Sequence, residues 1–324
     1  MRSAALGARA LAISLTCAAG GAVAQTSMDA REWLQRIYHA TQTLSYTGTF
    51  VYQHDRRSET SRVTRLASAQ EQVERLEVLD GEPREIVRSK EGVRCYLPQS
   101  RTLKVDRHGA SSRFPAVLPS QLSQLLSHYS ATLGTPDRVA GRACQTVVLR
   151  PMDNYRYGHE LCADTITGML LRSITLNEND VMVEQFTFTQ LDVGDVSPRA
   201  VEPLHATRSW RIEEASVQPA DLGAAGWRVD ADLPGFRKIV EVMRVPNERE
   251  PVGQLVYSDG LAAVSVFIEL AQGRRDSVRR GATAVGGVNI VVREVEGHVV
   301  TVVGEAPAAS VRRIADQVRY ERSK

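Results

Sequence analysis

Hydrophobic and polar positions alternate most clearly along residues 141–193. Four runs separated by turn-forming residues predict four consecutive antiparallel strands, at about 143–150, 156–163, 169–176 and 181–193. Pro151 ends the first run, because proline has no backbone N–H to extend a central ladder. The pattern therefore predicts a meander with one buried face.

The same period of two begins at residue 45 and continues through shorter runs. Further strands are expected near 45–53, 61–67, 72–79, 84–89, 93–98 and 101–106. Together with the meander they make a sheet of roughly ten or eleven strands, which has to curl or close in part. Helical spacing of apolar residues predicts helices over 28–41 and 119–130, which would cover one face of that sheet.

A second, smaller α+β domain is expected from residue 227 onward. Asp259-Gly260 lies between two apolar alternating runs and fits a two-residue hairpin turn. Two more strands, 287–295 and 298–304, flank Glu296-Gly297, and residues 307–320 have the spacing of a closing helix. Residues 197–226 lose this periodicity and collect proline, which is typical of a linker, although Trp210–Ile212 fits a short strand. The predicted domains are 25–196 and 227–324.

The first 24 residues have the pattern of a secretory signal peptide: a basic start, a short apolar run at 10–19 and a small-x-small site at Ala22–Ala24. The apolar run is too short to span a bilayer. Of the 40 basic residues two lie in this segment, so 38 basic residues then balance 38 acidic ones. A neutral surface argues against nucleic-acid binding, and we expect an exported protein.

In an exported protein, the cysteines can form disulfides. A hairpin that turns through 151–155 sets Arg150 opposite Arg156, and hence Cys144 directly opposite Cys162, close enough for a disulfide in an oxidising compartment. The alternative is two free thiols, since a one-residue change of register would separate them. Cys95 is then left over, either buried and inert or bridging two chains.

Catalytic and cofactor motifs are absent from the sequence: it has no G-x-S-x-G, no phosphate-binding loop, no G-x-G-x-x-G, no H-E-x-x-H and no C-x-x-C. Its seven histidines have no metal-ligand spacing. Tyr155–Glu160 is the densest polar and aromatic cluster, and we interpret it as one wall of a hairpin. We therefore expect neither catalysis, nor a cofactor, nor a metal.

Several segments together resemble the RseB/MucB family of periplasmic regulators of the envelope-stress sigma factor, sigma-E. They occur in order through nearly the whole chain: Thr49–Val51, Leu79–Val87, Arg156–Gly158, Asp164–Gly168, Glu184–Phe186, Leu233–Phe236, Tyr257–Leu261 and Val302–Glu305. The resemblance implies an antiparallel half-barrel like that of periplasmic lipoprotein carriers, with helices under it, joined to a smaller domain. It also implies a periplasmic protein that binds the periplasmic segment of a membrane-anchored anti-sigma factor and shields it from regulated proteolysis. Lipopolysaccharide or lipoprotein signals would release it.

Under this resemblance we predict two sets of site residues. The curled sheet is either filled by helices and side chains, which makes this domain only a scaffold, or it leaves an apolar groove for acyl chains. For the second case, side-chain parity within their strands predicts lining residues Tyr46, Phe50, Tyr52, Phe186 and Phe188, although the two strands need not present them on the same side. The partner is expected against the hairpin of the second domain, at Tyr257, Asp259, Gly260 and Phe267, or in the cleft between the domains. The alternative role of Asp259 and Gly260 is to form the turn alone. The alternative function is a periplasmic lipid or lipoprotein carrier, which would not need a second domain. The sequence leaves the oligomeric state open.

Overall fold

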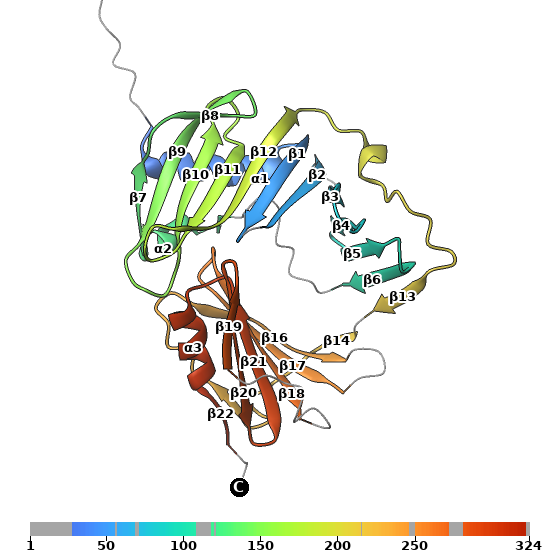
Figure 1. The fold of residues 1–324 in the computed structure, drawn as a ribbon, viewed down its shortest axis with the longest axis vertical. Helices are drawn as coiled ribbons and strands as arrows, with labels where there is room; N and C mark the ends of the chain where they lie inside the picture. The colour runs from blue at the N-terminus through green and yellow to red at the C-terminus, as the bar shows by residue number, and fades with distance from the viewer. Residues whose placement is uncertain are drawn as a thin grey trace, which may run out of the picture.

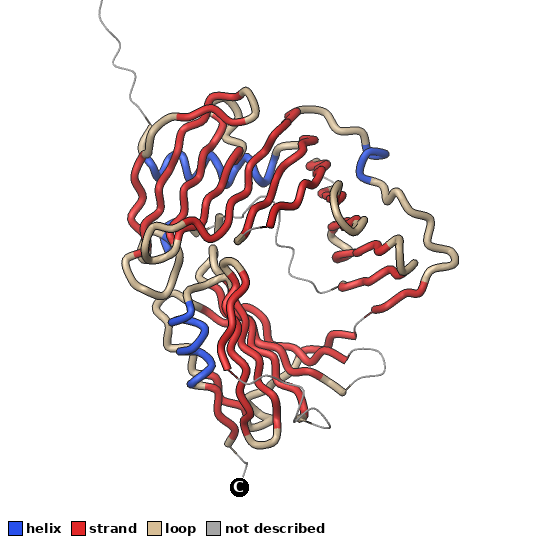
Figure 2. The backbone as a smooth tube through the Cα atoms, viewed as in Figure 1, coloured by secondary structure: helices blue, strands red, loops and turns tan. Residues whose placement is uncertain are grey.

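The structure is a computed structural model that describes residues 28–55, 57–68, 71–107, 118–119, 121–214, 216–245, 250–271 and 281–321. Two large, mainly antiparallel sheets carry most of the described residues, with a few helices against them (Figures 1 and 2). The expected α+β class and the open half-barrel are confirmed. The predicted signal peptide lies outside the described residues.

The first sheet has thirteen strands, more than expected, and it does not close. Its order is β13-β6-β5-β4-β3-β2-β1-β12-β11-β10-β9-β7, with β8 paired to β9. The strands are β1 (Tyr46–His54), β2 (Arg57–Ala67), β3 (Gln72–Val78), β4 (Glu85–Ser89), β5 (Gly92–Leu97), β6 (Thr102–Asp106), β7 (Tyr129–Leu133), β8 (Asp137–Val139), β9 (Arg142–Pro151), β10 (Gly158–Asp164), β11 (Leu170–Leu176), β12 (Met182–Val193) and β13 (Arg211–Glu214).

Helix α1 (Ala30–Thr43) packs on one face of this sheet. It begins at a capping box in which the Asp29 carboxylate accepts from the backbone of Glu32 and the Glu32 side chain accepts from the backbone of Asp29. Its apolar stripe, including Trp33, Leu34 and Ile37, meets Val147, Leu149, Leu161 and Leu170 of the meander. Side chains of opposite parity in the same strands form a separate cluster on the other face.

The expected helix over 119–130 is largely wrong. Only Leu122–Leu125 is helical (α2), and Tyr129 begins strand β7 at the edge of the sheet. Leu122, Leu125 and Tyr129 nevertheless share the buried cluster under α1. Helical spacing identified the buried residues correctly, but the free edge of β9 pairs with residues 129–133 and overrides the helical pattern.

Residues 197–226 carry more structure than the linker pattern suggests. A short 3-10 helix, η1 (Pro198–Val201), lies against β2 and β3. Strand β13, which includes two residues of the Trp210–Ile212 run, pairs parallel with β6, and β14 (Ser216–Pro219) pairs with the second sheet. The chain therefore passes from one sheet to the other between Glu214 and Ser216.

The second sheet has the order β14-β16-β17-β18-β21-β20-β19. Its further strands are β16 (Arg237–Val245), β17 (Val252–Ser258), β18 (Ala263–Leu270), β19 (Gly281–Val285), β20 (Val288–Val295) and β21 (His298–Gly304). Helix α3 (Ala308–Asp316) covers one face, and β15 (Trp227–Val229) pairs with β22 (Val318–Tyr320). The turn at Glu296-Gly297 is confirmed, because Val295 pairs with His298.

The turn at Asp259-Gly260 is longer than expected. Ser258 pairs with Ala263, so the loop has four residues rather than two. The Asp259 carboxylate accepts hydrogen bonds from the backbone N–H groups of Leu261 and Ala262, at 3.0 and 2.8 Å, and so closes the loop locally. The same carboxylate points toward the first domain.

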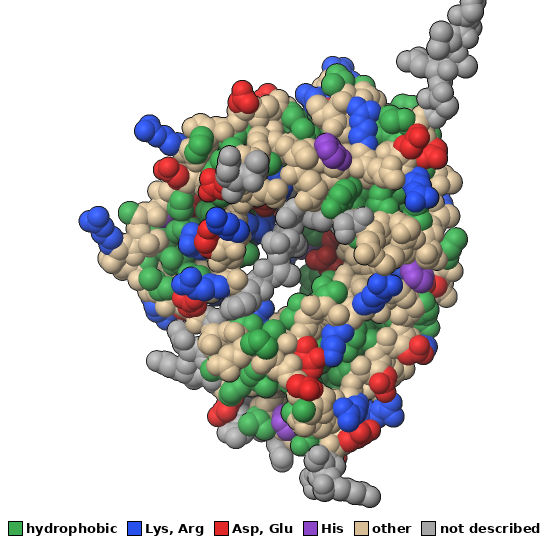
Figure 3. Space-filling model, turned by 180° about the vertical axis from the view of Figure 1, so that it is seen from behind, with side chains coloured by type: hydrophobic (Ala, Val, Ile, Leu, Met, Phe, Trp, Pro, Cys, Tyr) green, Lys and Arg blue, Asp and Glu red, His purple; other side chains and the backbone are tan. Residues whose placement is uncertain are grey.

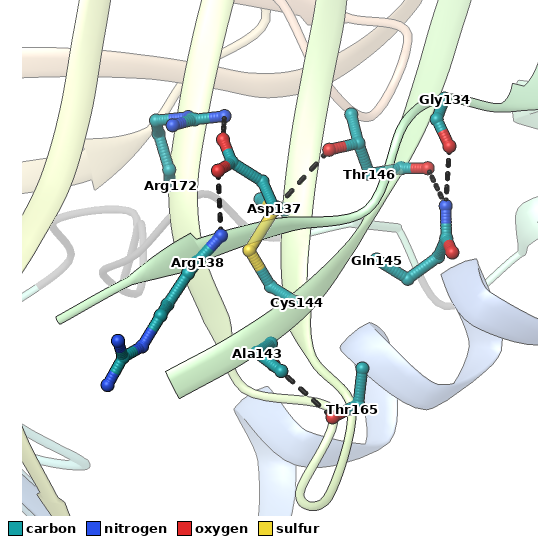
Figure 4. The surroundings of a disulfide bond; sticks show 10 residues. Gly134, Asp137, Arg138, Ala143, Cys144, Gln145, Thr146, Thr165 and Arg172 are labelled. Atoms are coloured by element: carbon teal, nitrogen blue, oxygen red, sulfur yellow. Dashed lines mark hydrogen bonds and ion pairs between the residues drawn. A yellow bond between two sulfur atoms is a disulfide. The ribbon is translucent and has the colours of Figure 1, made fainter. Parts of the chain in front are cut away.

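A disulfide joins Cys144 and Cys162, as expected, but the predicted register is wrong (Figure 4). Cys144 pairs with Asp164 and Cys162 pairs with Thr146, so the two cysteines are diagonal rather than directly opposite. The hairpin loop is longer than 151–155, because His159 is the first residue of β10 that pairs with β9, opposite Leu149. Cys95 is a half-buried free thiol.

Charged side chains of both signs are interspersed over the face seen in Figure 3. Within the described ranges, no helix is long and apolar enough to cross a bilayer. The described residues also contain no group of three or more His, Cys, Asp or Glu side chains that could hold a metal ion.

Candidate ligand and partner sites

Four of the five aromatic residues predicted to line a groove form one buried cluster on the face of the first sheet opposite α1. Phe50 pairs with Phe188 and Tyr52 with Phe186 across β1 and β12, so the two sets share a face. The rings meet edge to face, with centroids 4.9 Å apart for Phe186 and Phe188 and 5.2 Å for Phe50 and Phe186. Tyr46 packs edge-on against Phe188 at 6.1 Å.

This aromatic cluster depends on a glycine beneath it. A Cβ atom at Gly48 would lie 2.5 Å from Cε1 of Phe188 and 2.9 Å from the carbonyl oxygen of Gln190. The backbone oxygen cannot move without disturbing the pairing of β1 with β12. Only glycine at position 48 therefore lets the Phe188 ring lie flat on β1.

Tyr52 is the half-buried member of the cluster and connects it to the second domain. Its hydroxyl donates to the Glu184 carboxylate at 2.6 Å, which also accepts from Thr175 at 2.9 Å. Burial, then the hydrogen bond to Glu184, raises the pKa of Tyr52 well above its usual value, so the hydroxyl remains a donor. Beside Glu184 lies Gly287 in the turn between β19 and β20, whose Gly286 N–H donates to Asp55 at 2.7 Å.

A buried arginine joins the two domains. The Arg156 guanidinium lies 2.8 Å from the Asp259 carboxylate and 3.1 Å from that of Asp153, and its side chain is fully buried. It also donates to the carbonyl of Pro234 and lies over the rings of Tyr129 and Phe236, at 5.8 and 5.2 Å from their centroids. Aromatic faces and carboxylates of both domains thus surround one planar cation.

Neighbouring residues extend this interdomain contact. The Ser310 hydroxyl at the start of α3 donates to the carbonyl of Tyr155, and Arg313 donates to the Tyr155 hydroxyl at 3.1 Å. Asn289 donates to the Tyr157 hydroxyl at 3.0 Å. The stretch that we interpreted as a hairpin wall therefore contacts the second domain through three consecutive residues, Tyr155, Arg156 and Tyr157. Sequence alone gave no signal for this, because Arg156 and Asp259 are 103 positions apart.

The four residues predicted for partner binding do not form one surface. Tyr257 is in the core of the second domain, where its hydroxyl donates to the carbonyl of Val229 at 3.1 Å. Phe267 has the opposite parity from the core residues Val266 and Ile268, and is half-buried. Asp259 and Gly260 face the first domain, where a Cβ at Gly260 would lie 2.8 Å from Pro119.

Comparison with protein families gives two consecutive matches. Residues 29–219 match the MucB/RseB N-terminal domain and residues 221–319 match the MucB/RseB C-terminal domain. The two family domains meet close to the point where the chain passes from the first sheet to the second.

Characterised relatives align over nearly the whole chain. The sigma factor AlgU regulatory protein MucB of Pseudomonas aeruginosa is 34% identical over 92% of this chain and 93% of its own length. The sigma-E factor regulatory protein RseB of Haemophilus influenzae is 24% identical over 95% of this chain and 97% of its own. A crystal structure of MucB in complex with MucA(peri) covers 91% of this chain and 100% of that chain, with 31% identity and a TM-score of 0.69.

Proposed function

Since the chain belongs to the MucB/RseB family, we propose that it binds the periplasmic segment of a membrane-anchored anti-sigma factor, shields that segment from regulated proteolysis, and is released by lipid or lipoprotein signals. The relatives are regulatory proteins of sigma factors. The observation that carries the proposal is the alignment of both domains, at 31% identity, with a MucB structure that holds MucA(peri). Action on such a segment would require this chain to be in the periplasm, and the Cys144–Cys162 disulfide, which would persist there, supports this location.

In the proposed mechanism, the two domains act as one unit. Arg156 fixes their contact through Asp259 and the carbonyl of Pro234, and Tyr155 adds hydrogen bonds to α3. A peptide that touches both domains would bind best to the arrangement that this contact maintains. The partner would then be lost when the two domains change their relative position.

Acyl ligands would act from the aromatic cluster of the first domain. Its residues, Tyr46, Phe50, Tyr52, Phe186 and Phe188, pack into one apolar cluster, and Tyr52 links this cluster to the domain contact through Glu184. A ligand that displaces the Tyr52 ring would break the hydrogen bond to Glu184 and loosen the contact with Gly287. Release requires only that the ligand binds the partner-free form of the chain more tightly than the partner-bound form. The partner must then lower the affinity for the ligand by the same factor.

A protection assay tests the proposal. The periplasmic segment of the anti-sigma factor from the same organism is incubated with the protease that makes the first regulatory cut, with and without the mature chain. Protection that rises with chain concentration supports the proposal. Cleavage at the same rate with a stoichiometric excess of folded chain would refute it.

A further inference from the structure

A row of polar side chains crosses four strands of the first sheet on the face that carries the aromatic cluster. Tyr46 of β1 pairs with Arg65 of β2, Arg65 with Glu74 of β3, and Glu74 with Arg88 of β4. Cross-strand partners lie on the same face, so these four side chains are neighbours. Burial, followed by Glu74, raises the pKa of the Tyr46 hydroxyl, while Arg65 and Arg88 lower it, which places all three charges beside that hydroxyl.

Arg65 is the unusual member of the row. Its side chain is only 4% exposed, yet its Nε and Nη2 atoms, both buried, have no hydrogen-bond partner among the residues that the structure describes. The nearest carboxylate among these residues, Glu74, is 3.9 Å from Nη1, too far for a hydrogen bond. Glu74 is instead held at 2.6 Å by Arg88. A buried guanidinium with free N–H groups is costly unless an anion meets it, so the site is incomplete as it stands.

Apolar rows begin directly beside the charged one. The next row on the same face consists of Gly48, Val63, Leu76 and Ile86, and the row after it begins with Phe50. Val63 is fully buried and Leu76 is almost so. Two residues further along each strand, the face therefore changes from two arginines and one glutamate to aliphatic side chains, and aromatic ones follow.

We propose that Arg65, supported by Arg88, binds the phosphate or carboxylate headgroup of an acylated ligand whose chain runs along the apolar rows toward Phe50. The planar guanidinium offers Nε and Nη2 side by side, the geometry that grips two oxygens of one oxyanion. Two arginines against one glutamate leave one positive charge to neutralise. This deepens the proposed function and rests on its lipid-binding part, because it assigns the charge and the orientation of the ligand.

The test is titration calorimetry of the mature chain with three probes: dodecyl phosphate below its critical micelle concentration, the uncharged dodecyl maltoside, and inorganic phosphate. The variant is Arg65→Met, which removes the cation while Arg88 keeps Glu74 paired. The matched control is Arg62→Met on the same strand, because the Arg62 side chain is 47% exposed and pairs with Glu77. Thermal unfolding of each variant confirms that it is folded.

We expect Arg65→Met to raise the dissociation constant of dodecyl phosphate at least tenfold and to leave that of dodecyl maltoside unchanged. Arg62→Met should bind both amphiphiles as the parent chain does. Additional binding of inorganic phosphate, lost in Arg65→Met, would show that the site accepts a free oxyanion. If dodecyl phosphate binds Arg65→Met as tightly as the parent, the headgroup assignment is wrong while lipid binding stands. If neither amphiphile binds the parent chain, both the assignment and the lipid part of the proposed function fail.

Discussion

Arg156 of the first domain and Asp259 of the second lie 2.8 Å apart, with side chains 0% and 1% exposed. Removing one partner of a buried ion pair leaves the other charge uncompensated, which costs about 3–5 kcal/mol. Asp259→Asn keeps an oxygen for the loop N–H groups but removes the charge. Asp153 still pairs with Arg156 at 3.1 Å, so we predict a smaller loss, of up to about 3 kcal/mol, in the free energy of unfolding measured with urea.

The control for Asp259→Asn is an exposed ion pair. Arg150 and Asp180 also lie 2.9 Å apart, but their side chains are 60% and 65% exposed. Asp180→Asn should change stability by no more than about 1 kcal/mol. Equal effects of the two substitutions would mean that the Arg156–Asp259 contact does not hold the domains together.

The disulfide should contribute measurably to stability. Cys144 and Cys162 close a short loop, and such a bridge typically contributes about 2–4 kcal/mol by restricting the unfolded chain. Both cysteines are buried, so the bond is shielded until the sheet opens. We predict that the double substitution Cys144→Ala and Cys162→Ala lowers the melting temperature, whereas Cys95→Ala does not. A double variant that melts at the same temperature as the parent chain would contradict this.

Gly48 is predicted to be intolerant of any side chain. Gly48→Ala places a methyl group against the Phe188 ring and the Gln190 carbonyl, and overpacking of this kind costs about 1–3 kcal/mol. Gly287→Ala is the matched control, because its nearest contact would be an ordinary 3.5 Å. Urea unfolding of both variants separates the cases, and an equally small effect at both positions would show that Phe188 can move aside.

Stability should fall as the pH drops below 6.5, in part through His159. Burial lowers the pKa of His159 in the folded chain, although Glu184 and Asp259 act in the opposite direction. The unfolded chain then takes up the proton first, so this contribution is present above pH 6.5 and is lost between 6.5 and the lower folded pKa. The slope from this one group is at most about 1.4 kcal/mol per pH unit. His159→Gln should flatten the curve, and an unchanged profile would exclude His159 as the cause.

A substitution at Tyr52 should distinguish binding of the acyl ligand from the effect of that ligand on partner affinity. Tyr52→Phe keeps the ring but removes the hydroxyl that donates to Glu184. We expect acyl-ligand affinity close to that of the parent, with a smaller effect of the ligand on partner affinity. Both affinities come from calorimetry, and a coupling equal to that of the parent would show that the signal does not pass through this hydrogen bond.

Local periodicity predicted most of the fold because it depends on which face of a strand is buried. The meander and the turn at Glu296-Gly297 follow from it. The Cys144–Cys162 disulfide was also expected, but from a register that is wrong. The predictions are wrong where contacts between distant segments determine the local secondary structure. Helical spacing predicts a helix at Tyr129, but this residue begins an edge strand that pairs with β9. The hairpin after Pro151 is longer than expected, because Tyr155 and Arg156 contact the second domain before pairing resumes.

The candidate site was predictable only in part. Side-chain parity within each strand put Phe50 and Tyr52 on one side and Phe186 and Phe188 on one side, but only the register of β1 with β12 brings the two sets together. The sequence does not single out Arg65, because nothing local indicates that this strand arginine is buried with two nitrogens that lack hydrogen-bond partners in the described part of the chain. Burial and pairing between distant segments are properties of the folded chain.

The most direct test of the central claim is a calorimetric titration of the mature chain with the periplasmic segment of its anti-sigma factor, with and without saturating dodecyl phosphate. The account predicts binding of the segment by the ligand-free chain and a dissociation constant at least tenfold weaker with ligand, which is a coupling of about 1.4 kcal/mol. A segment that does not bind the ligand-free chain, or that binds equally well with and without the ligand, would contradict it.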